Sequence, residues 1–315
     1  MKKLFNIFIV SFALVFSSSV FANKIGVVYD SGGKFDKSFN ELAFKTAERV
    51  KNELGWEMVE FESSNDAQIE QGMRKIADRG ATMIVGMGFA QADAVAAVSA
   101  DYPDIKFVAV DVCWLDDPNN NIYQACYKEH EGSFLVGMMA AMASKTGTIG
   151  FVGGMDIPLI RKFQGGYEQG AQYVNPDIEV LANMTGTTNE AWNNPTKGAE
   201  LTKAQIDGGA DVVYQAAGGT GIGVLQAAAD AGIMGIGVDA NQNWMHPGNM
   251  LTSMLKRLDL TIFAQAEAIA AGTFEPSGQF LSLGLAEGGV GYATEDGMVT
   301  DEMAAAADAA AADIA

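Results

Sequence analysis

The sequence predicts an α/β protein of two similar lobes, each a parallel sheet flanked by helices. Short runs of β-branched and apolar residues alternate with helical periodicity over residues 24–128, and the same alternation repeats over residues 129–255. Strands that alternate with helices are typical of parallel sheets covered on both faces. The length of 315 residues also exceeds the roughly 250–300 residues that a single core usually supports. Two lobes therefore explain the sequence better than one.

The N-terminus is expected to be a cleavable signal peptide over residues 1–22. Lys2 and Lys3 form a basic start, and an apolar stretch follows over residues 4–16. This stretch is shorter than the roughly 20 apolar residues that cross a bilayer, and the residues up to Ala22 fit a cleavage site. No cysteine lies near this point to carry a lipid. We therefore expect an exported, periplasmic protein without a lipid anchor.

The first lobe is expected to begin with a strand over residues 24–30. The helix that follows has an apolar face from Phe39 to Leu54, and Ser38 and Glu41 match a capping box at its start. Further elements are predicted from short apolar runs and helical periodicity: strands near 56–61, 82–86 and 106–111, and helices around 69–76 and 91–100.

The second lobe repeats this rhythm after the loop at residues 114–121. The expected helices cover residues 131–144, 159–174, 194–206 and 221–231. The expected strands cover residues 148–153, 179–183, 211–216 and 233–239. Because strands and helices again alternate, this lobe should contain a second parallel sheet.

The C-terminal part is too short for a third lobe and should complete the first two. It contains strand signals at 250–256 and 279–285, a long helix at 258–271 and an alanine-rich helix at 300–315. We expect three strands to cross between the lobes, near residues 128, 256 and 276, and to form a hinge. The N-terminal lobe would then comprise residues 24–128 and 256–276, and the C-terminal lobe residues 129–255 and 277–315.

The composition disfavours several classes of function. Lys and Arg number 20 against 39 Asp and Glu, which gives a net charge of −19, and nucleic-acid binding needs a basic surface. Two histidines and two cysteines exclude zinc clusters and iron–sulfur sites. Phosphate-binding, serine-hydrolase and metalloprotease motifs are absent from the sequence. We expect no catalytic residue, no metal and no cofactor, and hence binding without turnover.

The two cysteines suit an oxidising compartment. Cys113 and Cys126 both lie in strand-like segments, and export would permit a disulfide between them. Two buried free thiols are the alternative, because unpaired cysteines are common core residues.

Three predicted strands end in an aspartate, namely Asp30, Asp111 and Asp239. Ligands of open α/β sheets bind at the carboxyl ends of the strands. A buried carboxylate needs hydrogen-bond donors, and two vicinal hydroxyl groups can supply them. The pattern favours a hydroxyl-bearing ligand, with helix capping as the alternative role for these side chains.

Five collinear motifs resemble the basic membrane protein (Bmp) family of ABC-transporter solute-binding proteins, many of which bind purine nucleosides. The resemblance spans residues 24 to 285 and rests on the segments KIGVVYDSGGKFDKSFN (24–40), GGMDIPLIRKFQGGYEQG (153–170), AWNNPTKGAE (191–200), GVDANQ (237–242) and LTSMLKRLD (251–259). It implies a type I periplasmic binding protein fold with two lobes, in agreement with the two runs of strands and helices.

The resemblance also implies a set of ligand-binding residues. The base would lie between Phe39 and Trp192, although Phe39 also fits a core position on its helix. The sugar would be bound by Asp30, Asp111, Asp239 and Lys256, with Asn40 and Gly218 as further contacts.

The sequence is therefore interpreted as that of a monomeric periplasmic protein that binds a nucleoside such as guanosine, adenosine or inosine and delivers it to an ABC permease in the inner membrane. A binding protein for riboflavin or a pentose is one alternative. An exported nucleosidase is another, from a different functional class.

Overall fold

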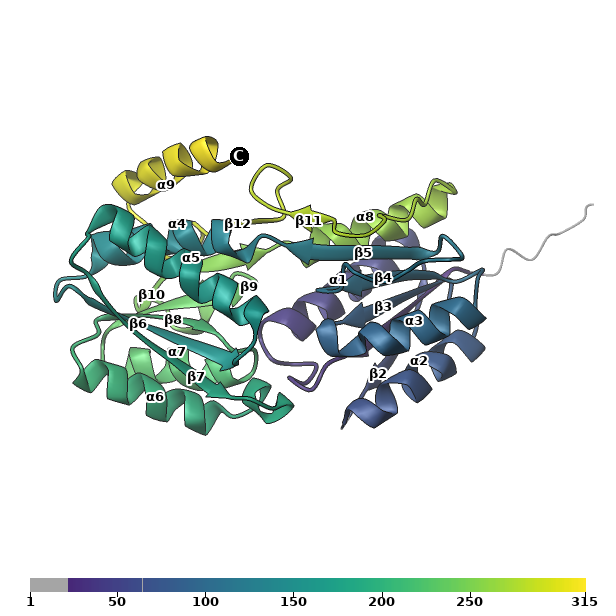
Figure 1. Cartoon of the computed structure of the whole chain (residues 1–315), viewed down its shortest axis with the longest axis horizontal. Coiled ribbons are helices and arrows are strands. Elements are labelled where there is room, and N and C mark those ends of the chain that lie inside the picture. The colour runs from purple at the N-terminus through teal and green to yellow at the C-terminus, as the bar shows by residue number, and fades with distance from the viewer. Residues whose placement is uncertain (1–21, 64) are drawn as a thin grey trace, which may run out of the picture.

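The computed structural model describes residues 22–63 and 65–315, so the predicted signal peptide lies outside the described residues except for Ala22. Two six-stranded sheets form two lobes that lie side by side (Figure 1). Helices cover both faces of each sheet, which confirms the predicted two-lobed α/β architecture. Across the described ranges, no helix is both long and apolar enough to cross a membrane.

The first sheet is parallel throughout and has the strand order β11-β5-β4-β3-β1-β2. Every residue of β3 is buried, because helices cover both faces of this central strand. The strands are β1 (Lys24–Tyr29), β2 (Glu57–Glu62), β3 (Met83–Met87), β4 (Lys106–Val110), β5 (Ile122–Tyr127) and β11 (Ser282–Leu283). The helices of this lobe are α1 (Phe39–Leu54), α2 (Ile69–Asp78), α3 (Ala92–Asp101) and α8 (Leu258–Ala271).

The second sheet has the order β12-β10-β9-β8-β6-β7, and only its pair β10–β12 is antiparallel. Its strands are β6 (Thr148–Met155), β7 (Glu179–Gly186), β8 (Val212–Ala216), β9 (Met234–Asp239), β10 (Met250–Lys256) and β12 (Val290–Tyr292). Its helices are α4 (Glu129–Ala143), α5 (Pro158–Val174), α6 (Pro195–Asp207), α7 (Thr220–Asp230) and α9 (Asp301–Ile314). Strand for strand, the two sheets are connected in the same order.

The chain passes between the lobes after β5, after β10 and after β11. The third passage was expected near residue 276, but the sheet pairing places it later. Ser277 exchanges hydrogen bonds with the backbone of Gln124, and Leu283 pairs with Tyr127 in the first sheet. Residues 277–283 therefore complete the first lobe, and only the chain beyond them joins the second. The three-residue strand β12 is too short to leave a pattern in the sequence.

The predicted capping box at the start of α1 does not form. Ser38 occupies the N-cap position without a side-chain capping bond. Asp36 accepts hydrogen bonds from the backbone N–H groups of Ser38, Asn40 and Glu41 at 2.9, 3.0 and 3.0 Å. Two carboxylate oxygens can accept all three bonds, whereas a single hydroxyl cannot. The cap is therefore an aspartate two residues upstream.

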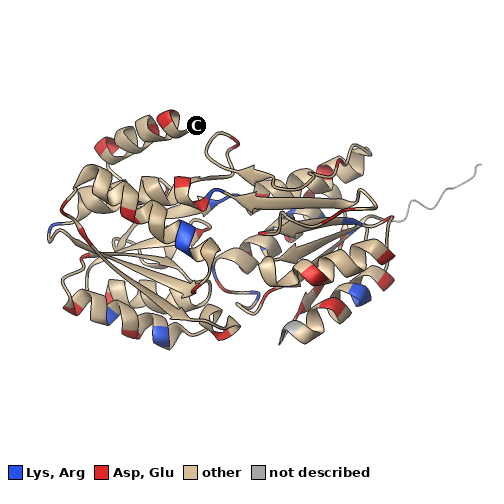
Figure 2. Cartoon of the chain, viewed as in Figure 1, with Lys and Arg blue, Asp and Glu red and all other residues tan. Residues whose placement is uncertain are grey.

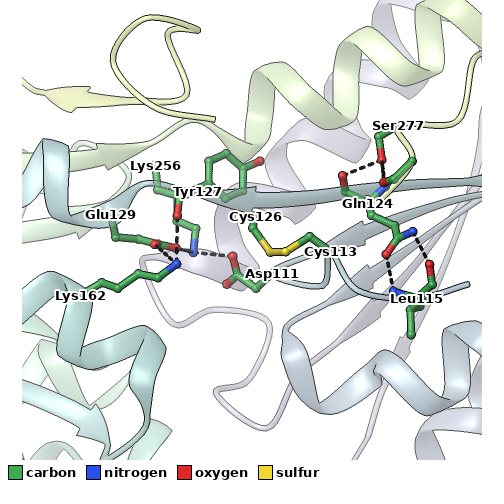
Figure 3. The surroundings of a disulfide bond; sticks show 11 residues. Asp111, Cys113, Leu115, Gln124, Cys126, Tyr127, Glu129, Lys162, Lys256 and Ser277 are labelled. Carbon is green, nitrogen blue, oxygen red and sulfur yellow. Dashed lines mark hydrogen bonds and ion pairs between the residues drawn. A yellow bond between two sulfur atoms is a disulfide. The ribbon is translucent and has the colours of Figure 1, made fainter. Parts of the chain in front are cut away.

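Cys113 and Cys126 form a disulfide, with their Cα atoms 5.7 Å apart (Figure 3). The bond joins the loop after β4 to the next-to-last residue of β5, next to the antiparallel bridge between Val112 and Ala125. A disulfide that closes a loop of this length restricts the unfolded chain and so stabilises the folded protein by about 3 kcal/mol. The disulfide thus secures the segment between Asp111 and the first passage to the second lobe.

Candidate functional site

A cavity lies between the lobes and is lined by residues of both. The lining residues follow the carboxyl ends of the strands or begin the next helices. They are Asp30, Gly32, Asp36, Phe39, Gly88, Phe89, Asp111, Leu159, Ile160, Phe163, Trp192, Ala216, Ala217, Gly218, Val238, Asp239 and Lys256.

Of the predicted site residues, all except Asn40 line this cavity. Asn40 is fully buried behind Asp30. Its amide nitrogen donates to a carboxylate oxygen of Asp30 and to the carbonyl of Gly33, and its amide oxygen accepts from the backbone N–H of Asp30. The side chain of Asn40 therefore orients Asp30, and its expected contact with a ligand stays a prediction.

Asp111 and Asp239 occupy matching positions in the two sheets. Asp111 directly follows β4 and Asp239 ends β9, and both backbones are left-handed, with φ of 62° and 64°. Aspartate tolerates this conformation better than most residues, but it still has an energetic cost. Both side chains are more than nine-tenths buried. The conformation turns two carboxylates from opposite lobes toward one cavity.

Lys256 is not a free cation at the cavity. It ends β10 and is 1% exposed, and its ammonium lies 2.6 Å from Asp111 and 3.0 Å from Glu129 (Figure 3). Burial by itself lowers the pKa of Lys256, but the carboxylates of Asp111, Glu129 and Asp239 raise it overall. The lysine therefore stays charged and binds two carboxylates together. Lys256 also lines the cavity, and its predicted contact with a sugar stays a prediction.

Glu129 was not identified from the sequence. It begins α4, directly after the first passage between the lobes, and it is fully buried. Its second carboxylate oxygen faces the half-exposed ammonium of Lys162 at 3.5 Å (Figure 3). A local sequence pattern cannot pair residue 129 with residue 256, because only the hinge brings them together.

Asp36 also lines the cavity. It is 3% exposed. Burial raises the pKa of Asp36 to about 7, although the backbone N–H groups of Asn40, Glu41 and Ser38 oppose this shift. Its carboxylate oxygens are already engaged in capping α1, so we assign it a structural role at the cavity wall.

The second lobe contributes an apolar wall. Trp192 lies in a short 3-10 helix (Asn189–Trp192) after β7, and its indole packs on Gly154, where a Cβ atom would lie 2.3 Å from the ring. Phe163, Leu159 and Ile160 come from the first turns of α5. These three were missed, although α5 directly follows the carboxyl end of β6 and so had to face the cleft.

This arrangement suits a ligand with one flat apolar part and one hydroxyl-bearing part. Phe39 lies at the start of α1 in the first lobe, lines the same cavity and is half-buried. Neither histidine lines the cavity. In the part of the chain that the structure describes, no cluster of His, Cys, Asp and Glu is suited to a metal ion.

Known proteins resemble this chain over most of its length. The family model of ABC transporter substrate-binding proteins, PnrA-like (Bmp), matches residues 22–312. "Basic membrane protein A2" of Borrelia garinii subsp. bavariensis is 34% identical over 286 residues, which cover 89% of this chain and 82% of that protein. "ABC transporter nucleoside-binding protein BmpA" of Lactococcus lactis subsp. cremoris is 31% identical over 289 residues, 85% and 80% of the two chains.

A solved structure extends the likeness to the fold. An ABC transporter solute-binding protein from Aeropyrum pernix K1 superposes with a TM-score of 0.83 at 27% identity, and covers 93% of this chain and 91% of its own. Sequence and structure thus agree over both lobes and the hinge. The chain belongs to the Bmp family, whose members are substrate-binding proteins of ABC transporters.

Proposed function

We propose that this protein binds a purine nucleoside in the interlobe cavity and delivers it to an ABC permease from the periplasm. The observation that carries the proposal is that one cavity is lined both by carboxylates and by aromatic rings. A nucleoside has two matching parts, a sugar with vicinal hydroxyls and a flat base. The printed name of the Lactococcus relative, a nucleoside-binding protein, supports this choice.

The sugar would lie at Asp30, Asp111 and Asp239. Each of these carboxylates lies at the end of a strand, and each can accept hydrogen bonds from ribose hydroxyls. Lys256 would hold Asp111 in place and keep its carboxylate ionised. Gly218, which has a left-handed backbone (φ 55°), would let the loop after β8 approach the ligand closely.

The base would stack between Phe39 and Trp192, with Phe163 completing the apolar wall. Aromatic stacking accepts any flat ring, so it selects a base without fixing which purine is preferred. The net charge of −19 disfavours polyanionic ligands, and acidic residues are spread over both lobes (Figure 2). The predicted signal peptide supports export, and a monomer would dock on the permease.

The test is isothermal titration calorimetry with guanosine, adenosine and inosine, and with ribose and riboflavin for comparison. We expect saturable binding of at least one purine nucleoside and weaker binding of ribose alone. Preferential binding of riboflavin or a pentose would replace the proposed ligand. Chromatography of the same mixtures should recover intact nucleoside, whereas release of free base would identify a nucleosidase.

A further inference from the structure

Two adjacent residues in the turn before α1, Lys37 and Ser38, behave differently from what their residue types predict. Ser38 leaves the capping of α1 to Asp36. Lys37 has a left-handed backbone with φ of 63°, which is uncommon for a residue other than glycine, asparagine or aspartate. Backbone strain of this kind persists where the surrounding structure holds it and often marks a functional segment.

Ser38 uses its free hydroxyl across the cleft. Its Oγ donates to a carboxylate oxygen of Asp239, 201 residues away on the second lobe, and also lies 3.3 Å from the carbonyl oxygen of Val238. Ser38 is fully buried in this contact. Because Asp36 caps the helix, the Ser38 hydroxyl serves the contact between lobes.

The carbonyl of Lys37 makes a second bond across the cleft. It accepts from the side-chain Nε2 of Gln242 at 2.9 Å. The Oε1 of Gln242 is occupied within its own lobe, where it accepts from Gln215 at 2.8 Å and from the N–H of Val238 at 2.9 Å. These bonds fix the orientation of the amide, so its N–H groups face the first lobe. Gln242 is 0% exposed.

We infer that Lys37, Ser38 and Gln242 form an interlobe latch that stabilises the closed form through protein atoms alone and holds the Asp239 carboxylate in place. The same contact therefore stabilises the closed form and positions the Asp239 carboxylate. Closing the lobes brings Ser38 to Asp239, so this carboxylate acquires its hydrogen-bond donor only when the cavity is assembled. The inference rests on the proposed function in that it assumes that the lobes open to admit a ligand.

The latch predicts that the free protein already populates the closed form. Because the acceptor is a carboxylate, losing the Ser38 hydroxyl should lower the closed-to-open ratio roughly 10- to 150-fold. Ser38→Ala should leave α1 intact, since Asp36 supplies the cap. Ser99→Ala is the matched control, because the hydroxyl of this buried serine of the same lobe donates to the carbonyl of Ala96 within its own helix.

The experiment measures interlobe distances in the ligand-free protein by double electron–electron resonance. Nitroxide labels are attached at Lys75→Cys on α2 and Lys203→Cys on α6, two exposed positions on opposite lobes. Labelling without reductant keeps the Cys113–Cys126 disulfide intact. We expect a short-distance population in the unsubstituted protein and in Ser99→Ala, and a reduced one in Ser38→Ala.

A second pair of variants tests the other bond. Gln242→Met removes the bond to Lys37 and two bonds within the second lobe, to Gln215 and to the N–H of Val238. Gln215→Met removes only bonds within the second lobe, to Gln242 and to the N–H of Ala217. The closed population should fall further in Gln242→Met than in Gln215→Met. Thermal unfolding of each variant checks that it remains folded.

Two results would overturn the latch: a free protein without any short-distance population, or distance distributions that are identical in Ser38→Ala and the unsubstituted protein. Neither result depends on a ligand. If purine nucleosides produce no binding heat, the proposed function fails, while the distances of the free protein still decide the latch.

Discussion

The two lobes have the same strand order but present different chemistry to the cavity between them. The first lobe places three carboxylates there, from Asp30, Asp36 and Asp111, together with the rings of Phe39 and Phe89. The second lobe places mainly apolar groups there, including Phe163, Trp192 and Val238, and one carboxylate, Asp239. Shared topology therefore determines where the residues meet, and the loop residues after each strand determine what a ligand would contact.

The two lobes also differ in how they stabilise one pair of equivalent carboxylates, those of Asp111 and Asp239. They have the same place in their sheets and nearly the same backbone conformation. Asp111 is neutralised by the buried ammonium of Lys256, whereas Asp239 accepts from a hydroxyl of the opposite lobe. Equivalent positions can thus be stabilised by a charge within the hinge or by closure itself.

The largest expected effect comes from removing the charge that supports Asp111. Lys256→Met leaves the carboxylates of Asp111 and Glu129 buried without their cation, and breaking a buried pair in this way costs about 3–5 kcal/mol. Urea unfolding should show this loss. The control is Lys162→Met, which removes a half-exposed partner of the same Glu129 and should cost about 0–1 kcal/mol. Equal losses in the free energy of unfolding of the two variants would contradict the structural role of Lys256.

The next test separates the two aspartates by their effect on binding. Asp239→Asn should weaken nucleoside binding by about 1.5–3 kcal/mol, or about 10- to 150-fold, because a charge-assisted bond to a hydroxyl is lost. Calorimetry with a 2′,3′-dideoxynucleoside should show a much smaller change, since its partner hydroxyls are missing. If both ligands weaken equally, Asp239 supports the loop and not the sugar.

Trp192→Ala tests the apolar side of the comparison. Loss of one stacking partner should weaken nucleoside binding by about 1–3 kcal/mol, or about 5- to 150-fold, with little change for ribose. Gly154→Ala should act in the same direction, because its methyl group would displace the indole without removing it. Unchanged nucleoside affinity in Trp192→Ala would contradict the stacking role.

A last test is the pH dependence of stability that comes from Asp36. Its pKa is raised to about 7 in the folded protein, so between about pH 4 and 7 the folded state holds a proton that the unfolded state has released. The free energy of unfolding should therefore fall as pH rises through this window, by at most about 1.4 kcal/mol per pH unit from this group. Asp36→Asn should flatten the slope. A slope that instead steepens in the variant would show that the backbone N–H bonds outweigh burial.

Much of the architecture and the cavity could be predicted from the sequence. Alternating strand and helix signals identified both lobes, and the carboxyl ends of the strands pointed to Asp30, Asp111 and Asp239. The resemblance to the family pointed to Phe39 and Trp192. Phe163 was missed because an aromatic residue on a predicted helix is usually assigned to the core. Only the position of α5 beside the cavity shows that this side chain lines it.

The sequence by itself determined which residues follow the strands, because that is a property of local patterns along the chain. Only the tertiary structure decided what those residues do. Asn40 orients Asp30, Lys256 binds Asp111 and Glu129, and Ser38 reaches Asp239 across the cleft. Each assignment depends on a partner supplied by folding, often from more than 100 residues away. A buried polar group must find a partner, and for Lys256 and Ser38 that partner lies beyond the reach of any local sequence pattern.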